Sequence, residues 1–367
     1  MTADRLTAEE ERLEAARAGA AAWRRWGPYL SERQWGTVRE DYSPDGAAWD
    51  YLSHDKARSQ AYRWGEDGIA GISDDRQQLC FALALWNGVD PILKERMFGL
   101  TNEQGNHGED VKECYFYLDN VPSHAYMKYL YKYPQSLFPY LDLVEENRRR
   151  GRGEPEYELL DTGVFDDNRY FDVFIEYTKE GPVDIVVKIT AINRGPDAAC
   201  LHLLPTLWFK DDWTWFPGNT RPRIEIDGRD AAAVVLKTTH RKLEPYWLYC
   251  EEPLQVLFTE NESNRERLYG VPNATPYVKD GIDEYIVQGR SGVVNPEHIG
   301  SKAAVHYVRT IDPGAASVIR LRLSGRGDQH LPSAADVDAL IRLRQGEADA
   351  FYRRVTPFEI SEDMRNV

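Results

Sequence analysis

The chain has 367 residues, 42% of them hydrophobic, which is enough to bury a full core in one large β domain or two smaller ones. Acidic residues outnumber basic residues by 60 to 45, and the resulting net charge of −15 is spread along the chain. This balance argues against nucleic acid as a partner, because phosphate neutralisation needs a concentrated positive field.

The cysteine spacing and the lengths of the apolar runs argue against a zinc protein and a membrane protein. The four cysteines, Cys80, Cys114, Cys200 and Cys250, are far apart and lack zinc-site spacing, so we expect free thiols. No apolar run approaches the roughly 20 residues that cross a bilayer, and the N-terminus has no signal-peptide pattern. We therefore expect a cytoplasmic location and no membrane partner. Nucleotide, phosphate and simple metal motifs are missing, so no cofactor and no metal are predicted.

Residues 1–71 are expected to form an N-terminal helix and an irregular arm packed on the rest of the chain. Thr7 and Glu10 make a capping box, and Gly27-Pro28 ends the helical pattern, which predicts a helix over Thr7–Trp26. From Tyr29 onward the apolar residues show no sustained period. That pattern is typical of ordered loops around short elements.

Strand patterns dominate residues 72–332. Both alternating faces of Leu79–Trp86 are apolar, and Asn87-Gly88 closes this run as a turn would. Similar runs follow at Cys114–Leu118, Tyr170–Tyr177, Ile185–Ile192, Cys200–Phe209, Arg223–Asp227, Ala233–Lys237, Tyr246–Tyr249, Val256–Thr259, Ala303–Thr310 and Val318–Leu323. Long crossover helices are missing between them, so we expect a mainly β fold, a two-layer antiparallel β-sandwich.

Three connecting segments are expected to lack strands. The basic run Arg148–Arg152 is flanked by glutamates and is predicted to be a solvated loop. The stretches at 217–222 and 261–280 are rich in Pro, Gly and Asn and are predicted to be long connections.

Residues 333–367 return to a helical pattern. Ser333 and Asp336 form a second capping box, and apolar residues recur at helical spacing as far as Val355. We expect an amphipathic helix that buries the face bearing Leu340 and Phe351 and ends near Thr356-Pro357.

Four long stretches resemble bacterial proteins of glycoside hydrolase family 63, which includes the processing α-glucosidase I. They are WGPYLSERQWGTVREDYS from Trp26, YRWGEDGIAGISDD from Tyr62, LTNEQGNHGEDVKE from Leu100 and ELLDTGVFDDNRYFDVFIEY from Glu158. The resemblance implies an N-terminal super-β-sandwich, then a linker helix and an (α/α)6 barrel that holds the general acid and base of an inverting α-glycosidase.

On this resemblance residues 333–367 correspond to the linker, and the catalytic residues lie in a barrel outside this chain. No catalytic residue is therefore assigned here. The implied partners are a carbohydrate substrate and the C-terminal barrel of the same polypeptide.

Two acidic loops are the candidates for substrate binding. The WGEDG loop carries Glu66 and Asp67, and the GNHGED loop carries His107, Glu109 and Asp110. These side chains could hydrogen-bond sugar hydroxyls at a substrate entrance. We favour the alternative that the glycines make turns while the acids cap elements or pair with arginines. Adjacent acids are poorly placed as a catalytic pair, because inverting glycosidases hold the two carboxyls about 6.5 to 9.5 Å apart.

An aromatic run that includes Trp213 and Trp215 is the third candidate. Such rings can stack on a pyranose face, but aromatic residues of a sheet core give the same pattern, and the core interpretation is favoured. The tyrosine-dense stretch from Tyr126 is ambiguous in the same way. Two rival functions stay open: a stand-alone sugar-binding module with an open aromatic groove, and a mutarotase-like or lyase-like sandwich that uses His107 with Glu109.

Overall fold

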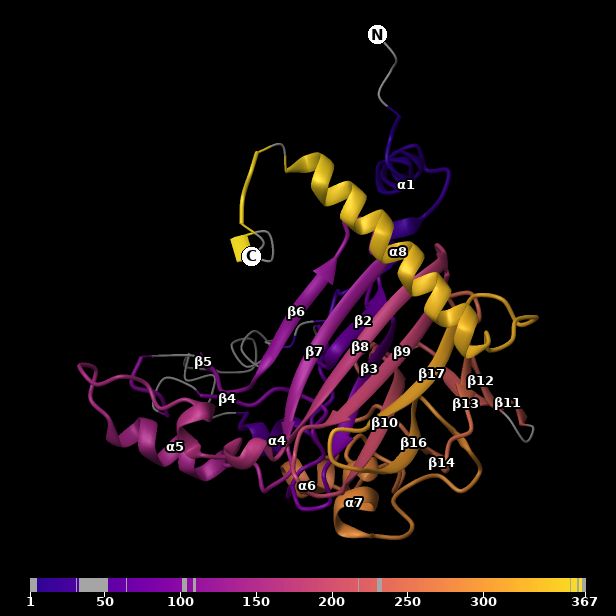
Figure 1. The fold of residues 1–367 in the computed structure, drawn as a ribbon. Helices are drawn as coiled ribbons and strands as arrows, with labels where there is room; N and C mark the ends of the chain where they lie inside the picture. The colour runs from indigo at the N-terminus through magenta and orange to yellow at the C-terminus, as the bar shows by residue number, and fades with distance from the viewer. Residues whose placement is uncertain are drawn as a thin grey trace.

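The computed structural model describes residues 5–30, 32, 52–63, 65–100, 104–107, 110–216, 218–229, 233–356, 358–361 and 363–364. Two antiparallel sheets packed face to face form its centre (Figure 1). The six-stranded sheet has the order β1 (Trp26–Gly27), β2 (Ile69–Asp74), β3 (Leu79–Trp86), β10 (Ala199–Phe209), β16 (Lys302–Ile311) and β14 (Gln255–Thr259).

The nine-stranded sheet has the order β15 (Ile299–Gly300), β11 (Arg223–Arg229), β12 (Ala233–Thr239), β13 (Trp247–Glu251), β17 (Ala316–Ser324), β9 (Asp184–Asn193), β8 (Tyr170–Gly181), β7 (Tyr126–Pro134) and β6 (Tyr115–Asn120). A separate pair joins β4 (Gly99–Leu100) to β5 (Asp110–Val111). Each predicted strand overlaps a strand of the structure, and the predicted two-layer antiparallel sandwich is confirmed.

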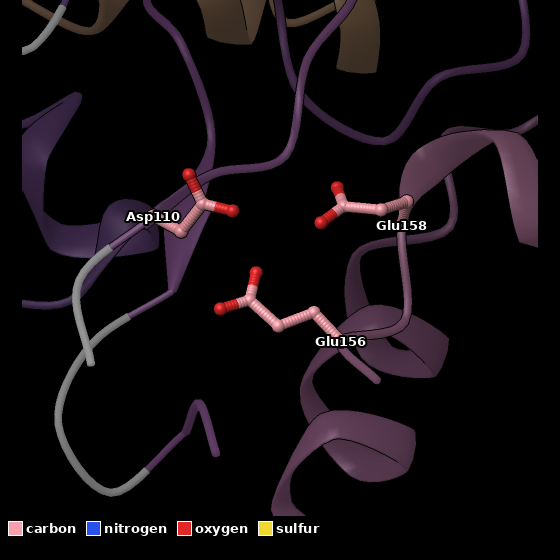
Figure 2. A group of neighbouring side chains, drawn as sticks. All are labelled: Asp110, Glu156 and Glu158. Carbon is pink, nitrogen blue, oxygen red and sulfur yellow. The ribbon is translucent and has the colours of Figure 1, made fainter. Parts of the chain in front are cut away.

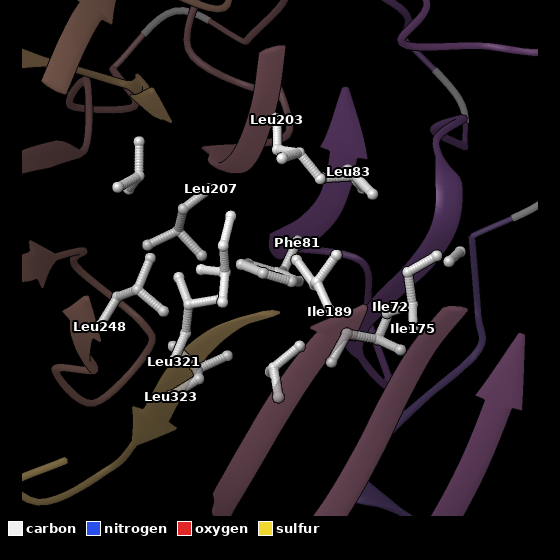
Figure 3. Packing of buried hydrophobic residues seen from close by; sticks show 14 of the residues in the cluster. Ile72, Phe81, Leu83, Ile175, Ile189, Leu203, Leu207, Leu248, Leu321 and Leu323 are labelled. Atoms are coloured by element: carbon white, nitrogen blue, oxygen red, sulfur yellow. The ribbon is translucent and has the colours of Figure 1, made fainter. Parts of the chain in front are cut away.

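Alternation along β3 explains how the layers pack. Phe81 and Leu83 point into the core between the sheets, where they meet Ile175 and Ile189 from the opposite sheet (Figure 3). The intervening residue Ala82 faces outward and packs in a second cluster with Leu30, Cys80 and Trp208. Both faces of β3 are buried, as the sequence predicts, because irregular segments cover the outer face of the six-stranded sheet.

The helices lie around the sandwich. They are α1 (Ala8–Arg17), α4 (His54–Ala57), α5 (Tyr140–Arg149), α6 (Arg265–Tyr269), α7 (Gly281–Gln288) and α8 (Ala334–Val355). In Figure 1, α8 runs across the strands β7, β8, β9 and β17 of the nine-stranded sheet, with α1 beside it. Among the helices of the described ranges, none is long and apolar enough to cross a membrane.

Three predictions of local structure need correction. The N-terminal helix has the predicted Thr7 cap but ends at Arg17, because Gly19 takes a left-handed conformation with φ 68°. Helix α5 includes Arg148 and Arg149, so the basic run is not all loop; Glu146 supports it by accepting hydrogen bonds from Arg149 and Arg150. The predicted connection at 261–280 contains the short helix α6, capped by Asn264.

The predicted C-terminal helix is present as α8 and begins at the Ser333 cap. Its buried stripe is Val337, Ile341, Arg344, Ala348 and Phe351, which recur three or four residues apart. Phe351 is buried as predicted, whereas Leu340 is only half buried at the edge of that stripe.

Candidate functional site

Glu66 and Asp67 are buried against the outer face of the six-stranded sheet, with exposed fractions of 1% and 6%. Their position depends on Gly68, where a Cβ atom would lie 2.5 Å from the Cβ of Ala82 in β3. Only glycine lets this segment approach the sheet so closely. The carboxylates are thereby held where water does not reach them and must find partners within the protein.

Asp67 is bound by two side chains. The Tyr62 hydroxyl donates to its Oδ2 atom at 2.9 Å, and Nε of Arg96 lies 3.5 Å from the same oxygen. Arg96 also donates through Nη2 to Glu95 at 2.9 Å. Glu95 in turn binds Nζ of Lys302 on β16 at 2.9 Å. A chain of alternating charges therefore runs from the WGEDG loop to the sheet.

Glu66 belongs to the same group of side chains. Its Oε1 atom accepts a hydrogen bond of 3.4 Å from Nδ2 of Asn261. Burial raises the pKa of Glu66 to about 7, and the Lys279 ammonium opposes this shift. Burial and the Arg96 charge lower the pKa of Lys279 to about 8, while its Nζ donates to the Gln60 carbonyl at 2.7 Å. We call Glu66, Asp67, Glu95, Arg96, Lys279 and Lys302 the buried charge cluster.

The side chains of the buried charge cluster join segments that are far apart in the sequence. Nη1 of Arg96 is buried and has no hydrogen-bond partner within the described part of the chain. Asp67 and Glu95 pair with Arg96 and Lys302, while Glu66 is buried beside Asn261. Such an arrangement fixes loops firmly, but it offers no exposed acid or base to a substrate.

The aromatic candidates lie next to this cluster. Nε1 of Trp213 donates to Glu262 at 2.6 Å, and Glu262 follows Asn261, the residue that binds Glu66. Trp215 is 37% exposed, and the Arg63 guanidinium lies 5.8 Å from the centre of its ring. The structure thus brings two of the three sequence candidates to one region.

The GNHGED loop has different partners. His107 Nε2 forms a 2.9 Å hydrogen bond with the backbone carbonyl of Glu154. Glu109 lies outside the described residues. The loop is thus tied to the segment that follows α5, and none of its described residues forms a hydrogen bond or ion pair with the buried charge cluster.

Asp110 meets two glutamates that the sequence analysis did not single out. The carboxylates of Asp110, Glu156 and Glu158 point toward one another (Figure 2), as oxygen ligands of a cation would. The centre is taken by the Lys112 ammonium, which binds them at 2.8, 2.7 and 2.8 Å. The lysine is thus the counter-ion of this group. The alternate spacing of Glu156 and Glu158 on one face of an extended segment was the signal available in the sequence.

Glu32 is a further residue that sequence reasoning missed. It accepts hydrogen bonds from the Ala70 backbone at 3.0 Å and from the Tyr117 hydroxyl, and burial raises its pKa to about 7. Nearby, Tyr117, Tyr129 and Tyr177 line a cavity of about 250 Å³ at the β2 and β6 edges. The sequence around Glu32 has no sustained apolar period, so nothing in it marked this glutamate as a buried residue.

Comparisons with known proteins give one clear sequence relative. No family model matches the chain. It is 41% identical over 403 residues to the uncharacterised protein YMR196W of Saccharomyces cerevisiae. The match covers 98% of this chain and 37% of the yeast protein, so the chain spans little more than a third of that relative's length.

Solved structures resemble the chain only distantly. One is a galactose mutarotase-related enzyme from Lactobacillus acidophilus, 7% identical with a TM-score of 0.29, covering 72% of this chain and 90% of that one. Another is a protein described as a kojibiose phosphorylase, from the human microbiome, 9% identical with a TM-score of 0.30, covering 84% and 32%. Similarity at this level carries no conclusion about the activity of the chain.

Proposed function

We propose that this chain is the β-sandwich portion of a larger α-glycoside hydrolase resembling family 63, in which it supports the catalytic barrel and shapes the substrate entrance. One observation carries the proposal. Glu66 and Asp67 are both buried and Asp67 pairs with Arg96, so these acids do not form the accessible pair that glycoside hydrolysis needs. The described acids of the WGEDG loop therefore act as scaffold.

Two further observations support a larger polypeptide. The yeast relative is nearly three times as long as the segment that matches it. The resemblance of the four quoted stretches to family 63 implies a barrel after the sandwich, and α8 follows the last strand of the sandwich, as a linker helix would. The choice of an α-glycosidic substrate rests on that resemblance.

The proposed contribution to the entrance is the exposed part of the aromatic run. Trp215 and Phe216 are 37% and 44% exposed, and Arg63 lies over both rings. Exposed rings with a cation beside them can stack on a sugar and hydrogen-bond its rim. The stand-alone sugar-binding module would use the same rings, so binding alone does not separate the two functions.

Measurement of enzymatic turnover distinguishes the glycosidase portion from the stand-alone sugar-binding module. Hydrolysis of a panel of α-glucosides and α-mannosides is measured for this chain and for the full-length product of its gene. We expect turnover by the full-length protein and none by residues 1–367. Turnover by residues 1–367 that Asp67→Asn abolishes would move the active site into this chain and overturn the proposal. Sugar binding lost in Trp215→Ala, with no turnover by the full-length protein, would favour the stand-alone module.

A further inference from the structure

A cavity of about 640 Å³ lies where the N-terminal arm meets the sandwich. Its walls come from the end of α1, the segment that follows it, the turn between β2 and β3, the segment after β10, and the loop between β12 and β13. This volume is in the range of small-molecule sites. The candidate substrate-binding residues of the sequence are not among its lining residues.

Basic side chains dominate this cavity. Five basic residues face three acidic ones, Asp74, Asp75 and Asp212, which leaves a net charge of +2 on a chain whose total is −15. The basic residues are Arg17, Arg24, Arg25, Arg76 and Lys242. None of the five makes an ion pair within the described ranges. Many other arginines of the described chain form ion pairs; Arg322, for example, pairs with Asp184 at 2.6 Å.

Two details show that part of this charge is available to a ligand. The Asp74 carboxylate already has partners, because it accepts hydrogen bonds from the backbone N–H groups of Arg76, Gln78 and Leu79 at 2.9, 2.8 and 2.7 Å. Its charge therefore stabilises the turn and does not pair with the cations. Nε of Arg25 is buried and has no hydrogen-bond partner among the described residues. A buried guanidinium nitrogen of this kind lacks an acceptor that an anion would supply.

We propose that this cavity binds a small phosphorylated carbohydrate, with its phosphate on the arginines and its hydroxyls on Asp75 and Asp212. Guanidinium groups match phosphate oxygens in geometry and charge. Among the described residues, no side chain forms a hydrogen bond or ion pair with either carboxylate, so both can accept from hydroxyl groups. The same carboxylates would repel a phosphate backbone, which disfavours nucleic acid. The inference stands on this cavity alone and does not rest on the proposed glycosidase function.

Titration calorimetry with glucose 6-phosphate, inorganic phosphate and glucose tests the proposal. We expect one molecule of glucose 6-phosphate to bind, phosphate to bind more weakly, and glucose not to bind. Arg76→Ala and Lys242→Ala should each weaken the binding of glucose 6-phosphate about tenfold, the loss expected for one charge-assisted contact. Both side chains are exposed and form no ion pair with a described residue, so the variants should fold, and their unliganded melting temperatures check this.

The matched control is Arg152→Ala, which removes one exposed arginine outside the cavity and should leave the affinity unchanged. Absence of binding, or equal binding by the Arg76→Ala/Lys242→Ala double variant, would overturn the proposal. Equal loss in the Arg152→Ala control would also overturn it, because the attraction would then come from charge in general. Phosphate binding as tightly as glucose 6-phosphate would contradict the carbohydrate assignment.

Discussion

Arg344 of α8 donates through Nε to the backbone carbonyl of Lys179 in β8 at a distance of 2.9 Å. This bond ties the C-terminal helix to the sandwich beside the apolar stripe that contains Ile341 and Phe351. A second tie is the 2.7 Å ion pair between Lys188 of β9 and Asp338 of α8. The proposed linker helix is thus fixed to the nine-stranded sheet along its length.

Truncating the buried stripe of α8 should destabilise the whole protein. Ile341→Ala removes a buried side chain from the cluster with Val121 and Val186, and we expect a loss of about 2 to 4 kcal/mol in unfolding free energy. Leu343→Ala is the control on the exposed face of the same helix and should cost roughly 0.5 kcal/mol or less. Urea denaturation measures both. Equal effects would mean that α8 is not packed on the sheet as described.

Gly68 should tolerate no side chain. A Cβ atom there would lie 2.5 Å from Ala82 and 3.3 Å from the Trp208 ring, so Gly68→Ala must displace the WGEDG segment or the strand. We expect about 1 to 3 kcal/mol of destabilisation in urea, the usual range for overpacking. Gly153→Ala is the matched control, because no atom lies within 4 Å of its Cβ position. Gly68→Ala behaving like Gly153→Ala would contradict the close approach.

The strand pattern of the sequence was enough to predict the sandwich, but it could not predict the partners of the acidic loops. Alternation along β3 depends only on neighbouring residues, so both its faces could be assigned. Asp67 instead meets Arg96, and Glu66 meets Asn261 and Lys279, all far along the chain. Contacts of that kind depend on how the loops fold over the sheet. Local periodicity carries no information about them.

The tyrosine-dense stretch from Tyr126, which the sequence left ambiguous between a sugar-binding face and a sheet core, belongs to the sheet core. It forms β7, and its residues Met127, Tyr129, Tyr131 and Tyr133 belong to the core between the two sheets. Lys128 and Lys132 lie on the opposite face and are half buried, so the run does alternate. The alternation alone could not show whether the tyrosine face packs on a second sheet or binds a sugar, because both uses place aromatic rings at every second position.

Stability should fall as the pH rises through the titration range of Glu32. Burial raises the folded-state pKa of Glu32 from 4.5 to about 7, so between these values the folded protein binds the proton more tightly than the unfolded chain. The contribution of Glu32 to the unfolding free energy should therefore be largest below pH 4.5. It should decrease by up to about 3 kcal/mol by pH 7 and above. Glu32→Gln should remove this decrease.

Urea denaturation at several pH values, compared between wild type and Glu32→Gln, measures the difference directly. Glu14→Gln, an exposed glutamate of α1, is the control and should keep the wild-type pH profile. A Glu32→Gln variant whose stability follows pH as the wild type does would show that Glu32 is ionised in the folded state at pH 5.

Removing Lys112 should turn its three carboxylates into a cation site. In the Lys112→Met variant, Asp110, Glu156 and Glu158 lose the ammonium that binds all three, and their mutual repulsion should cost about 1 to 3 kcal/mol. Calcium prefers such clustered carboxylate oxygens, so millimolar Ca²⁺ should restore part of the melting temperature. Wild type and the exposed-lysine control Lys56→Met should not respond to Ca²⁺. A calcium response in wild type would show that Lys112 does not fill the site.

The last prediction concerns β6, the edge strand of the nine-stranded sheet. Its side chains Phe116, Tyr117 and Leu118 are 44%, 60% and 47% exposed, an uncommon group of large apolar residues on an edge that no other described strand pairs with. Unpaired backbone groups on such an edge recruit another strand, and the apolar side chains add contact area. In the proposed larger protein this face is where a partner domain can pack.

We therefore expect residues 1–367 to self-associate through β6 when expressed alone. Leu118→Lys places a charge on the exposed edge without touching the buried core, so it should shift the sedimentation profile toward monomer. Leu254→Lys is the control, because Leu254 is equally apolar and 64% exposed but lies beside β14 of the other sheet. Self-association that persists in Leu118→Lys and is lost in Leu254→Lys would move the interface to the six-stranded sheet. A monomer in all three proteins would mean that β6 is protected within the chain, since its exposed side chains would then attract no partner.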